Sequence, residues 1–295
     1  MNLKRRIVHY LYDHHLPFMI NRRWKATYGY KIDWKHPKDI NEKMWWLACF
    51  GDTSKWALCS DKYRVREYLK ECGLEDIAVK LYGVWEKVED IDYDALPQKF
   101  VLKCNHDSGT SIVVDKSKSF NKDAINKQLN EAFKVKFGYI NGETYYNKIK
   151  PCIIAEEFLE SHDCDFSKTL VDYKIWCFDG KPFCTWACYN RENGHAYVDI
   201  YDMNWNAHPE YSVRTDHYRD GEGKVPKPKT FDKMMEIASK LSKGFPEVRI
   251  DLYEVDGKVY FGEMTFMTLF AQIDFYTKDF LVELGTQCIL PVDKR

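Results

Sequence analysis

Apolar and polar residues alternate along Val248–Phe266, VRIDLYEVDGKVYFGEMTF, in a pattern typical of β-strands. The central Asp256-Gly257 pair predicts a tight turn, so we expect a β-hairpin with two mostly buried strands. Asp251 lies on the first strand and Glu263 on the second. Two buried carboxylates on adjacent strands are costly unless they bind a cation, and their oxygens suit Mg²⁺. The alternative is a surface hairpin with solvated acids.

A second hairpin is predicted over Phe100–Asp115, FVLKCNHDSGTSIVVD. Its strands span residues 100–104 and 112–114, and a polar loop, 105–111, joins them. Backbone N–H groups of such a Ser-, Gly- and Thr-containing loop can surround phosphate oxygens, and Lys103 adds a positive charge beside it. Neither the Walker A pattern nor GxGxxG is present. The alternative is an ordinary hairpin with an exposed lysine.

Two further apolar segments follow, PCIIAEEFLE at Pro151–Glu160 and LVDYKIWCFDG at Leu170–Gly180. The second alternates as a strand and ends in an Asp-Gly turn. Lys174 lies among its apolar positions, where a lysine is expected to have an anionic partner. The alternative is a half-exposed lysine on an edge strand.

Helical periodicity predicts helices over residues 40–50, 61–71 and about 231–241, with Gly73 ending the second. Near the N-terminus, basic residues at Lys4–Arg6 and Arg22–Lys25 lie close to apolar ones at helical spacing. Such a segment can lie on an anionic membrane. We favour the alternative, a helix that packs on the body of the protein.

The segment Tyr189–Pro228 is polar, aromatic and turn-rich, and its glycines and prolines predict a long loop. Its cations are candidates for holding the carboxylate or phosphate of a substrate. They are Arg191, Arg214, His217 and Arg219, with Arg214 and Arg219 the best candidates and Arg191 a weaker one; His195 lies in the same segment. Solvated loop cations are the alternative.

The amino-acid composition excludes some classes of function and location. The 295 residues carry a net charge of −1, which argues against nucleic acid as a partner. The ten cysteines show no CxxC or zinc spacing, so we expect reduced, mostly buried thiols in a cytoplasmic protein. No apolar run has the length of a transmembrane helix. Aromatic residues make up 16% of the chain; most are expected in the core, and some suit sugar stacking.

The chain resembles the TupA-like ATP-grasp family of bacterial surface-polysaccharide biosynthesis. The resemblance extends over most of the chain, through INEKMWWL, SDKYRVREYL, LPQKFVLKCNHDSG, EEFLE, DYKIWCFDGKP and VRIDLYEVDGKVYFGEMTF. Two positions depart from the usual pattern. Thr265 stands where ATP-grasp enzymes usually carry Asn, and MTLFAQIDF at Met267–Phe275 replaces a Pro-, Gly- and Ser-containing continuation.

The resemblance implies an α/β (α+β) ATP-grasp fold with two lobes that clamp ATP. It places a helical N-terminal region at residues 1–95 and the ATP-grasp domain at 96–295, with a hinge near 154–160. The implied nucleotide-binding residues are Lys103, Asn105, His106, Ser108, Gly109, Thr110, Ser111, Glu156, Glu157, Phe158 and Leu159. Glu156 is expected to accept from the adenine amino group. The implied catalytic residues are Lys174 and Arg249, and the Mg²⁺ ligands are Asp251, Glu263 and Thr265.

The implied activity is ATP- and Mg²⁺-dependent ligation. A sugar acid, either a small molecule or part of a lipid-linked glycan, is activated as an acyl phosphate and joined to an amine or amino acid. We expect a cytoplasmic enzyme, with the inner face of the membrane as an alternative location through the N-terminal segment. Three alternatives remain: a sugar kinase with the same site, a glycosyltransferase of the same pathway, and a non-catalytic glycan-binding protein.

Overall fold

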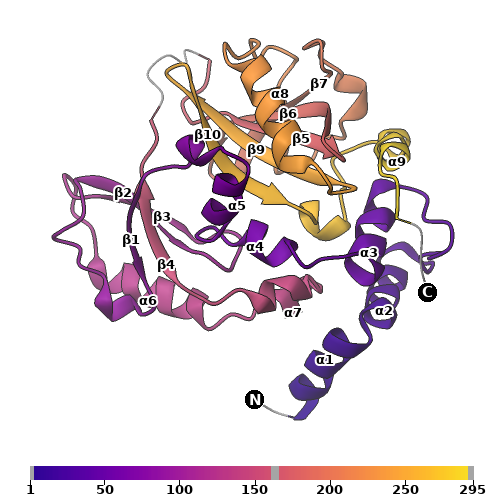
Figure 1. The fold of residues 1–295 in the computed structure, drawn as a ribbon, viewed down its shortest axis with the longest axis horizontal. Coiled ribbons are helices and arrows are strands. Elements are labelled where there is room, and N and C mark those ends of the chain that lie inside the picture. The colour runs from indigo at the N-terminus through magenta and orange to yellow at the C-terminus, as the bar shows by residue number, and fades with distance from the viewer. Residues whose placement is uncertain (1–2, 161–165, 292–295) are drawn as a thin grey trace. The chain divides into compact units, whose positions relative to one another are not determined.

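The alternating segments form two separate β-sheets (Figure 1), seen in a computed structural model that describes residues 3–160 and 166–291. The chain divides into two units. The first comprises Met1–Thr53 and Glu160–Arg295, and the second comprises Ser54–Leu159. The domain boundary predicted between residues 95 and 96 therefore falls inside the second unit.

The second unit contains a four-stranded antiparallel sheet in the order β1-β4-β2-β3. Its strands are β1 Leu81–Trp85, β2 Lys99–Cys104, β3 Ser111–Asp115 and β4 Ile153–Glu157, and its helices are α4 Trp56–Ser60, α5 Val65–Glu71, α6 Lys122–Phe133 and α7 Gly138–Asn141. Short 3₁₀ turns lie at η1 Glu75–Ile77, η2 Val88–Asp90 and η3 Thr144–Lys148. The predicted hairpin at 100–115 is confirmed.

One face of this sheet packs against α6. Phe100, Leu102 and Cys104 alternate along β2 toward that core, where they join Leu129 of α6 and Ile153 of β4. The side-chain period of two therefore turns Lys103 to the opposite face of the sheet.

The first unit contains a six-stranded sheet in the order β10-β9-β5-β6-β7-β8, antiparallel except for the β7/β8 pair. Its strands are β5 Asp172–Phe178, β6 Lys181–Glu192, β7 His195–Tyr201, β8 Tyr218–Asp220, β9 Val248–Val255 and β10 Lys258–Thr265. Its helices are α1 Leu3–His14, α2 Leu16–Tyr28, α3 Ile40–Phe50, α8 Phe231–Ser242 and α9 Lys278–Gln287, with 3₁₀ turns at η4 Pro209–Tyr211 and η5 Thr268–Ala271. α8 packs on β5, β6 and β9, and α3 packs on α9.

Local sequence accounts for most of these boundaries. α3 spans the predicted residues 40–50, and Asp39 caps it by accepting from the Glu42 backbone N–H at 2.9 Å. Such a cap contributes about 1 kcal/mol. The β9–β10 turn has Asp256 and Gly257 at positive φ, as predicted.

Two expectations about elements are wrong. The helix predicted over 61–71 begins only at Val65, because the Asp61 carboxylate accepts from the backbone N–H groups of Tyr63 and Arg64 and holds a turn there. The predicted loop 189–228 contains the end of β6 and the strands β7 and β8. Sheet pairing with β6 overrides its polar composition, since its apolar residues Ala196, Val198 and Ile200 are buried.

Candidate functional site

Two polar clusters contain most of the predicted site residues, one in each unit. The β9 cluster lies on one face of the six-stranded sheet, around Asp251. Strand register places Lys174 of β5 on one side of Asp251 and Glu263 of β10 on the other. The predicted hairpin thus brings its two acids together, and β5 adds the predicted lysine to them.

A β-bulge at Gly262 produces this alignment. The Asp256-Gly257 turn pairs Val255 with Lys258, and continued regular pairing would put Gly262 opposite Asp251. The register shifts by one residue between Phe261 and Glu263, so that Glu263 faces Asp251 instead. Glycine is required at the bulge, because a Cβ there would lie 2.9 Å from the Asp251 carbonyl oxygen.

Asp251 is paired with two cations. Arg249, two residues earlier on the same strand face, donates from Nε to Oδ1 at 2.7 Å and from Nη2 to Oδ2 at 2.8 Å. Lys174 donates from Nζ to Oδ2 at 2.5 Å. Lys174 therefore has the anionic partner that its strand context predicted, and the alternative of a half-exposed edge lysine is wrong.

Burial by itself would raise the pKa of Asp251, but Arg249 and Lys174 outweigh it and lower that pKa to about 2. For Lys174, burial opposes the charged form, yet Asp172 and Asp251 raise the pKa above its usual value. Arg249 behaves in the same way, because burial is outweighed by Asp251 and Glu263. All three side chains are therefore charged and hold one another in place.

Glu263 corrects the expectation of two buried acids. Asp251 is only 1% exposed, whereas the Glu263 side chain is 50% exposed. Its Oε1 accepts from Arg249 Nη2 at 3.2 Å and from the Thr265 hydroxyl at 3.1 Å. β10 is an edge strand, so a side chain on it keeps access to solvent.

The oxygen atoms of Asp251, Glu263 and Thr265 are the donor type that Mg²⁺ takes. Glu263 fits such a role directly, being half exposed beside the Thr265 hydroxyl. Both oxygens of Asp251 are bonded to Lys174 and Arg249 in this structure. Within residues 3–160 and 166–291, no group of three His, Cys, Asp or Glu side chains is arranged to hold a metal. The oxygen donors therefore fit Mg²⁺ in chemical type, but the Asp251 oxygens are bonded to Lys174 and Arg249.

The second cluster, the β4 cluster, surrounds Glu156 in the four-stranded sheet. Lys103 Nζ donates to Oε2 at 2.8 Å, and Arg66 Nη2 donates to Oε1 at 2.7 Å. The Glu156 side chain is nearly buried, while the two cations are partly exposed. Glu156 is thus held between two positive groups, one of which, Arg66, was not predicted.

The predicted phosphate loop, residues 105–111, has a buried and an exposed part. Asn105 is buried, and its amide bonds Asp61 Oδ1 at 2.9 Å and the Lys150 carbonyl at 3.0 Å and accepts from the Cys152 N–H at 2.7 Å. These contacts anchor the loop. His106 is also buried, and burial lowers its pKa. The exposed end contains Ser108, Gly109 and Ser111, with Thr110 partly exposed and donating to the Asp107 carboxylate.

The predicted hinge continues from β4. The Glu157 backbone N–H donates to the Lys80 carbonyl at 2.9 Å, so this group is already used within the sheet. Lys99 Nζ lies 3.9 Å from the centre of the Phe158 ring, a cation–π distance. Phe158 and Leu159 are both partly exposed.

Arg191 is the candidate acceptor residue whose contacts lead to the β9 cluster, whereas the other candidates lie around the paired strands β7 and β8. Arg191 Nη2 bonds Asp172 Oδ2 at 3.2 Å, and the same oxygen lies 3.5 Å from Lys174 Nζ, which links Arg191 to the β9 cluster. Arg214 is largely exposed and bonds Asp220. The His217 and His195 rings contact backbone carbonyls of Gly194 and Asp216, and Arg219 is exposed.

Sequence reasoning missed several residues that support the site. They are Asp61, Lys62, Arg66, Asp172 and Thr268. Arg66 and Lys62 occur in SDKYRVREYL, a segment that carried the family resemblance, but no spacing rule links it to Glu156, about 90 residues later. No sequence pattern marks Thr268 either. Its hydroxyl oxygen accepts from Arg249 Nη1 at 3.1 Å.

Residues 42–289 match the TupA-like ATP-grasp family. The chain belongs to this family. No curated protein matches the chain. The predicted fold class, an α/β ATP-grasp fold preceded by helices, is confirmed for this TupA-like protein.

Several solved ATP-grasp enzymes are similar to the TupA-like chain at low identity. D-alanine–D-alanine ligase from Bacillus anthracis, complexed with ATP, is 17% identical over 75% of this chain and 56% of its own, with a TM-score of 0.39. The ATP-grasp ligase PsnB, complexed with its precursor peptide PsnA2 and AMPPNP, is 11% identical over 95% and 72%, with a TM-score of 0.42. Phosphoribosylamine–glycine ligase from Thermotoga maritima is 12% identical over 71% and 48%, with a TM-score of 0.41. The chain spans 56–60% of the length of the first structures it matches.

Proposed function

We propose that this TupA-like protein is an ATP- and Mg²⁺-dependent ligase that joins the carboxylate of a sugar acid to an amine or amino acid. The pathway would be assembly of a bacterial surface polysaccharide, at a cytoplasmic site. The observation that carries the proposal is the β9 cluster, where Lys174 and Arg249 lie beside the oxygens of Asp251 and Glu263 on one sheet face. Membership of the TupA-like ATP-grasp family supports it.

In this proposal, the residues of the β9 cluster neutralise charge on a phosphoryl group in transfer. Lys174 and Arg249 are fixed, permanently charged donors, and donors that need no reorganisation stabilise a transition state best. Asp251, Glu263 and Thr265 would hold Mg²⁺, which supplies charge neutralisation between the phosphates. The half-exposed Glu263 is the metal-facing end of the cluster.

The β4 cluster suits the nucleotide. Glu156 would accept from the adenine amino group, since it lies near the end of the buried strand β4, just before the partly exposed Phe158 and Leu159. Lys103 and Arg66 orient its carboxylate, and the partly exposed Lys103 would also contact a phosphate oxygen. The backbone N–H groups of the exposed residues Ser108 and Gly109 would contact the phosphates, whereas the Ser111 N–H already donates to the Gly109 carbonyl at 3.1 Å.

The reaction balances without a side-chain nucleophile. A carboxylate oxygen of the acid forms a bond to the γ-phosphorus of ATP, and ADP leaves. The amine then attacks the acyl carbon and loses a proton, and inorganic phosphate leaves with that carboxylate oxygen. A sugar acid needs a cation for its carboxylate, and Arg191, linked to Lys174 through Asp172, is the candidate that the contacts favour over Arg214, His217 and Arg219.

Oxygen-18 transfer tests the proposal. With the acid labelled in its carboxylate, the TupA-like enzyme should release labelled phosphate together with ADP, and only when an amine is present. Uronic acids and amino acids form the first panel. A phosphorylated sugar without amide would instead show a kinase. A thermal shift with UDP-sugars and Mg²⁺, but none with ATP and Mg²⁺, would favour a glycosyltransferase.

A further inference from the structure

The N-terminal helices α1 and α2 form a surface that the proposed function does not use. They precede residue 42, where the family match begins. Within α1, Tyr12 is the only residue buried against the rest of the chain. A helix that packed on the body, as the sequence favoured, would bury a full apolar face. α1 instead has apolar side chains that face solvent.

These exposed side chains form a stripe along α1. Leu3, Ile7 and Tyr10 follow the i, i+4, i+7 spacing of one helix face, and they are 71%, 51% and 57% exposed. Lys4 and Arg6 are exposed beside this stripe. An apolar stripe edged by cations is typical of a helix that lies in the surface of a bilayer, with its charges at the headgroups.

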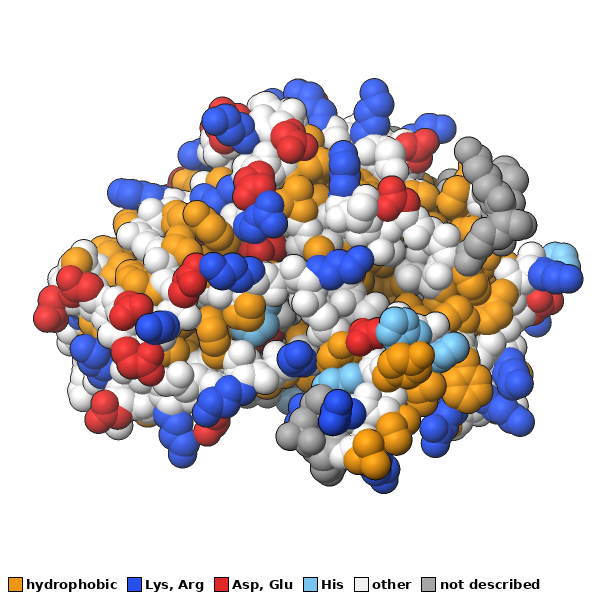
Figure 2. Space-filling view, turned by 60° about the horizontal axis from the view of Figure 1, so that its bottom comes forward, with side chains coloured by type: hydrophobic (Ala, Val, Ile, Leu, Met, Phe, Trp, Pro, Cys, Tyr) orange, Lys and Arg blue, Asp and Glu red, His pale blue; other side chains and the backbone are white. Residues whose placement is uncertain are grey.

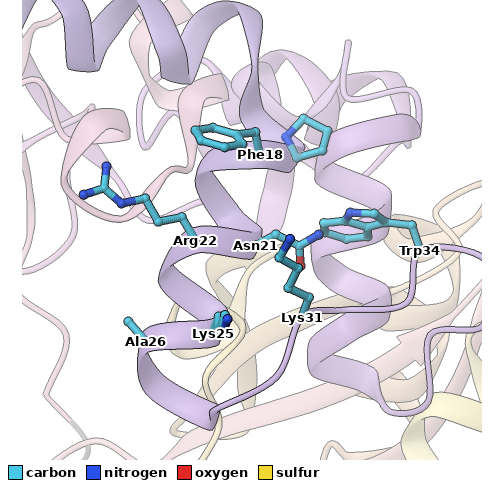
Figure 3. A pocket seen from close by; sticks show the side chains of 8 residues that line it. Phe18, Asn21, Arg22, Lys25, Ala26, Lys31 and Trp34 are labelled. Carbon is cyan, nitrogen blue, oxygen red and sulfur yellow. The ribbon is translucent and has the colours of Figure 1, made fainter.

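α2 also presents an exposed apolar side chain, here followed by cations on the same helix face. Phe18 is 61% exposed, and Arg22 and Lys25 follow it at i+4 and i+7. With Lys31 and Trp34 from the segment after the helix, they line a pocket of about 670 Å³ (Figure 3). Two aromatic rings and three cations around one open pocket suit an anionic headgroup with the upper part of its acyl chain.

Charge complementarity selects the partner. Residues 1–31 contain seven Lys and Arg against a single Asp, a net charge of +6 in a chain whose total is −1. Figure 2 shows hydrophobic, histidine and basic side chains gathered at the lower edge of that view. Among the described residues no helix is long and apolar enough to cross a membrane. The surface therefore suits contact with a bilayer at its headgroup level.

We infer that α1 and α2 dock this protein on bilayers that contain anionic phospholipid, with the Leu3–Ile7–Tyr10 stripe in the acyl boundary and Arg22 and Lys25 at the headgroups. Each basic side chain near an anionic surface strengthens binding about five-fold. Apolar insertion strengthens it further, by about ten-fold or more for two large side chains. The inference does not depend on the proposed ligase activity.

Vesicle co-sedimentation of the full chain tests the inference. The probes are vesicles of phosphatidylcholine alone and vesicles with about one third phosphatidylglycerol, at low and at physiological salt. We expect binding to the anionic vesicles only, weakened by salt. Arg22→Glu with Lys25→Glu should weaken it by at least ~30-fold, and Ile7→Ser with Tyr10→Ser by at least ~10-fold.

Matched controls separate this surface from general effects. Lys87→Glu with Lys136→Glu changes the same charge at exposed positions elsewhere, and Val282→Ser with Ile289→Ser removes exposed apolar groups elsewhere. Both should bind as wild type does. Because all the replaced side chains are exposed, every variant should keep the wild-type Tm. If one α1–α2 variant has a lower Tm, vesicle binding by the other still tests the inference.

Three outcomes would overturn the inference. They are no binding to anionic vesicles, equal binding to neutral and anionic vesicles, and equal losses in the α1–α2 variants and their controls. Analytical ultracentrifugation tests the alternative that a second copy of the chain binds this surface. If the wild-type protein does not bind vesicles but forms a dimer, and the α1–α2 variants are monomeric, the surface binds a second copy of the chain.

Discussion

Glu247 provides the sharpest test of the energetics beside the β9 cluster. It directly precedes β9, its side chain is fully buried, and neither carboxylate oxygen has a hydrogen-bond partner among the described residues. Burial raises its pKa well above the usual value, and Arg249 opposes this only in part. We predict that Glu247→Gln, which keeps the shape and removes the titration, changes how stability depends on pH.

The magnitude follows from the linkage between protonation and folding. Below about pH 4.5, its ordinary pKa, Glu247 is protonated in the folded and unfolded chain alike. Above it the unfolded chain ionises and the folded chain does not, so the folded state loses about 1.4 kcal/mol per pH unit up to the raised pKa.

Urea unfolding of wild type and Glu247→Gln at pH 5, 6 and 7 measures this effect. Relative to wild type, the free energy of unfolding of the variant should rise as the pH rises from 5, by at most about 1.4 kcal/mol per pH unit. The control, Glu131→Gln on the exposed side of α6, should differ from wild type by less than about 0.5 kcal/mol at every pH. Parallel pH curves for wild type and Glu247→Gln would refute the reasoning, since they would show that the carboxyl ionises in the folded state.

Four further predictions concern the site. Glu263→Gln should lower ATP-dependent turnover about 10²-fold with an unchanged Tm, because the side chain is half exposed and contributes charge more than packing. Lys174→Met should abolish activity and, at pH 7, destabilise the protein by about 1.5–3 kcal/mol, because it removes one of the two cations that bond the buried Asp251 and leaves Arg249 alone there. Gly262→Ala should lower both Tm and turnover, since its Cβ would meet a backbone oxygen at 2.9 Å. Arg191→Ala should raise the KM for the acid at constant ATP affinity, whereas Arg214→Ala should leave both unchanged.

Each of these variants can contradict the assignments. Turnover of Glu263→Gln within a few-fold of wild type would exclude it as a metal ligand. A Lys174→Met protein of wild-type stability would mean that Arg249 alone is sufficient to pair Asp251. Gly262→Ala with normal kinetics would show that the bulge tolerates a side chain, and equal acceptor KM values for Arg191→Ala and Arg214→Ala would place Arg191 outside the acceptor site.

Local patterns in the sequence determined much of the fold. The alternation in residues 100–115, 170–180 and 248–266 predicted strands that are present, because a side-chain period of two is a property of each strand alone. Local sequence also determined the turns at Asp256-Gly257 and Asp179-Gly180, whose residues adopt positive φ. It likewise determined the helix at 40–50, which Asp39 caps. The predicted pairing of Lys174 with an acid also followed, since a buried lysine requires one.

Pairings between distant segments were decided by the tertiary structure. The one-residue shift at Gly262 moves Glu263 onto the face of Asp251, and a shift in register depends on both strands together. Arg66 reaches Glu156 from a helix 90 positions earlier. β7 forms from a polar segment because it pairs with β6, and β8 forms because it pairs with β7. Exposure of the α1 stripe is likewise invisible in the sequence, because an amphipathic pattern shows which residues share a face and only packing shows which face is covered.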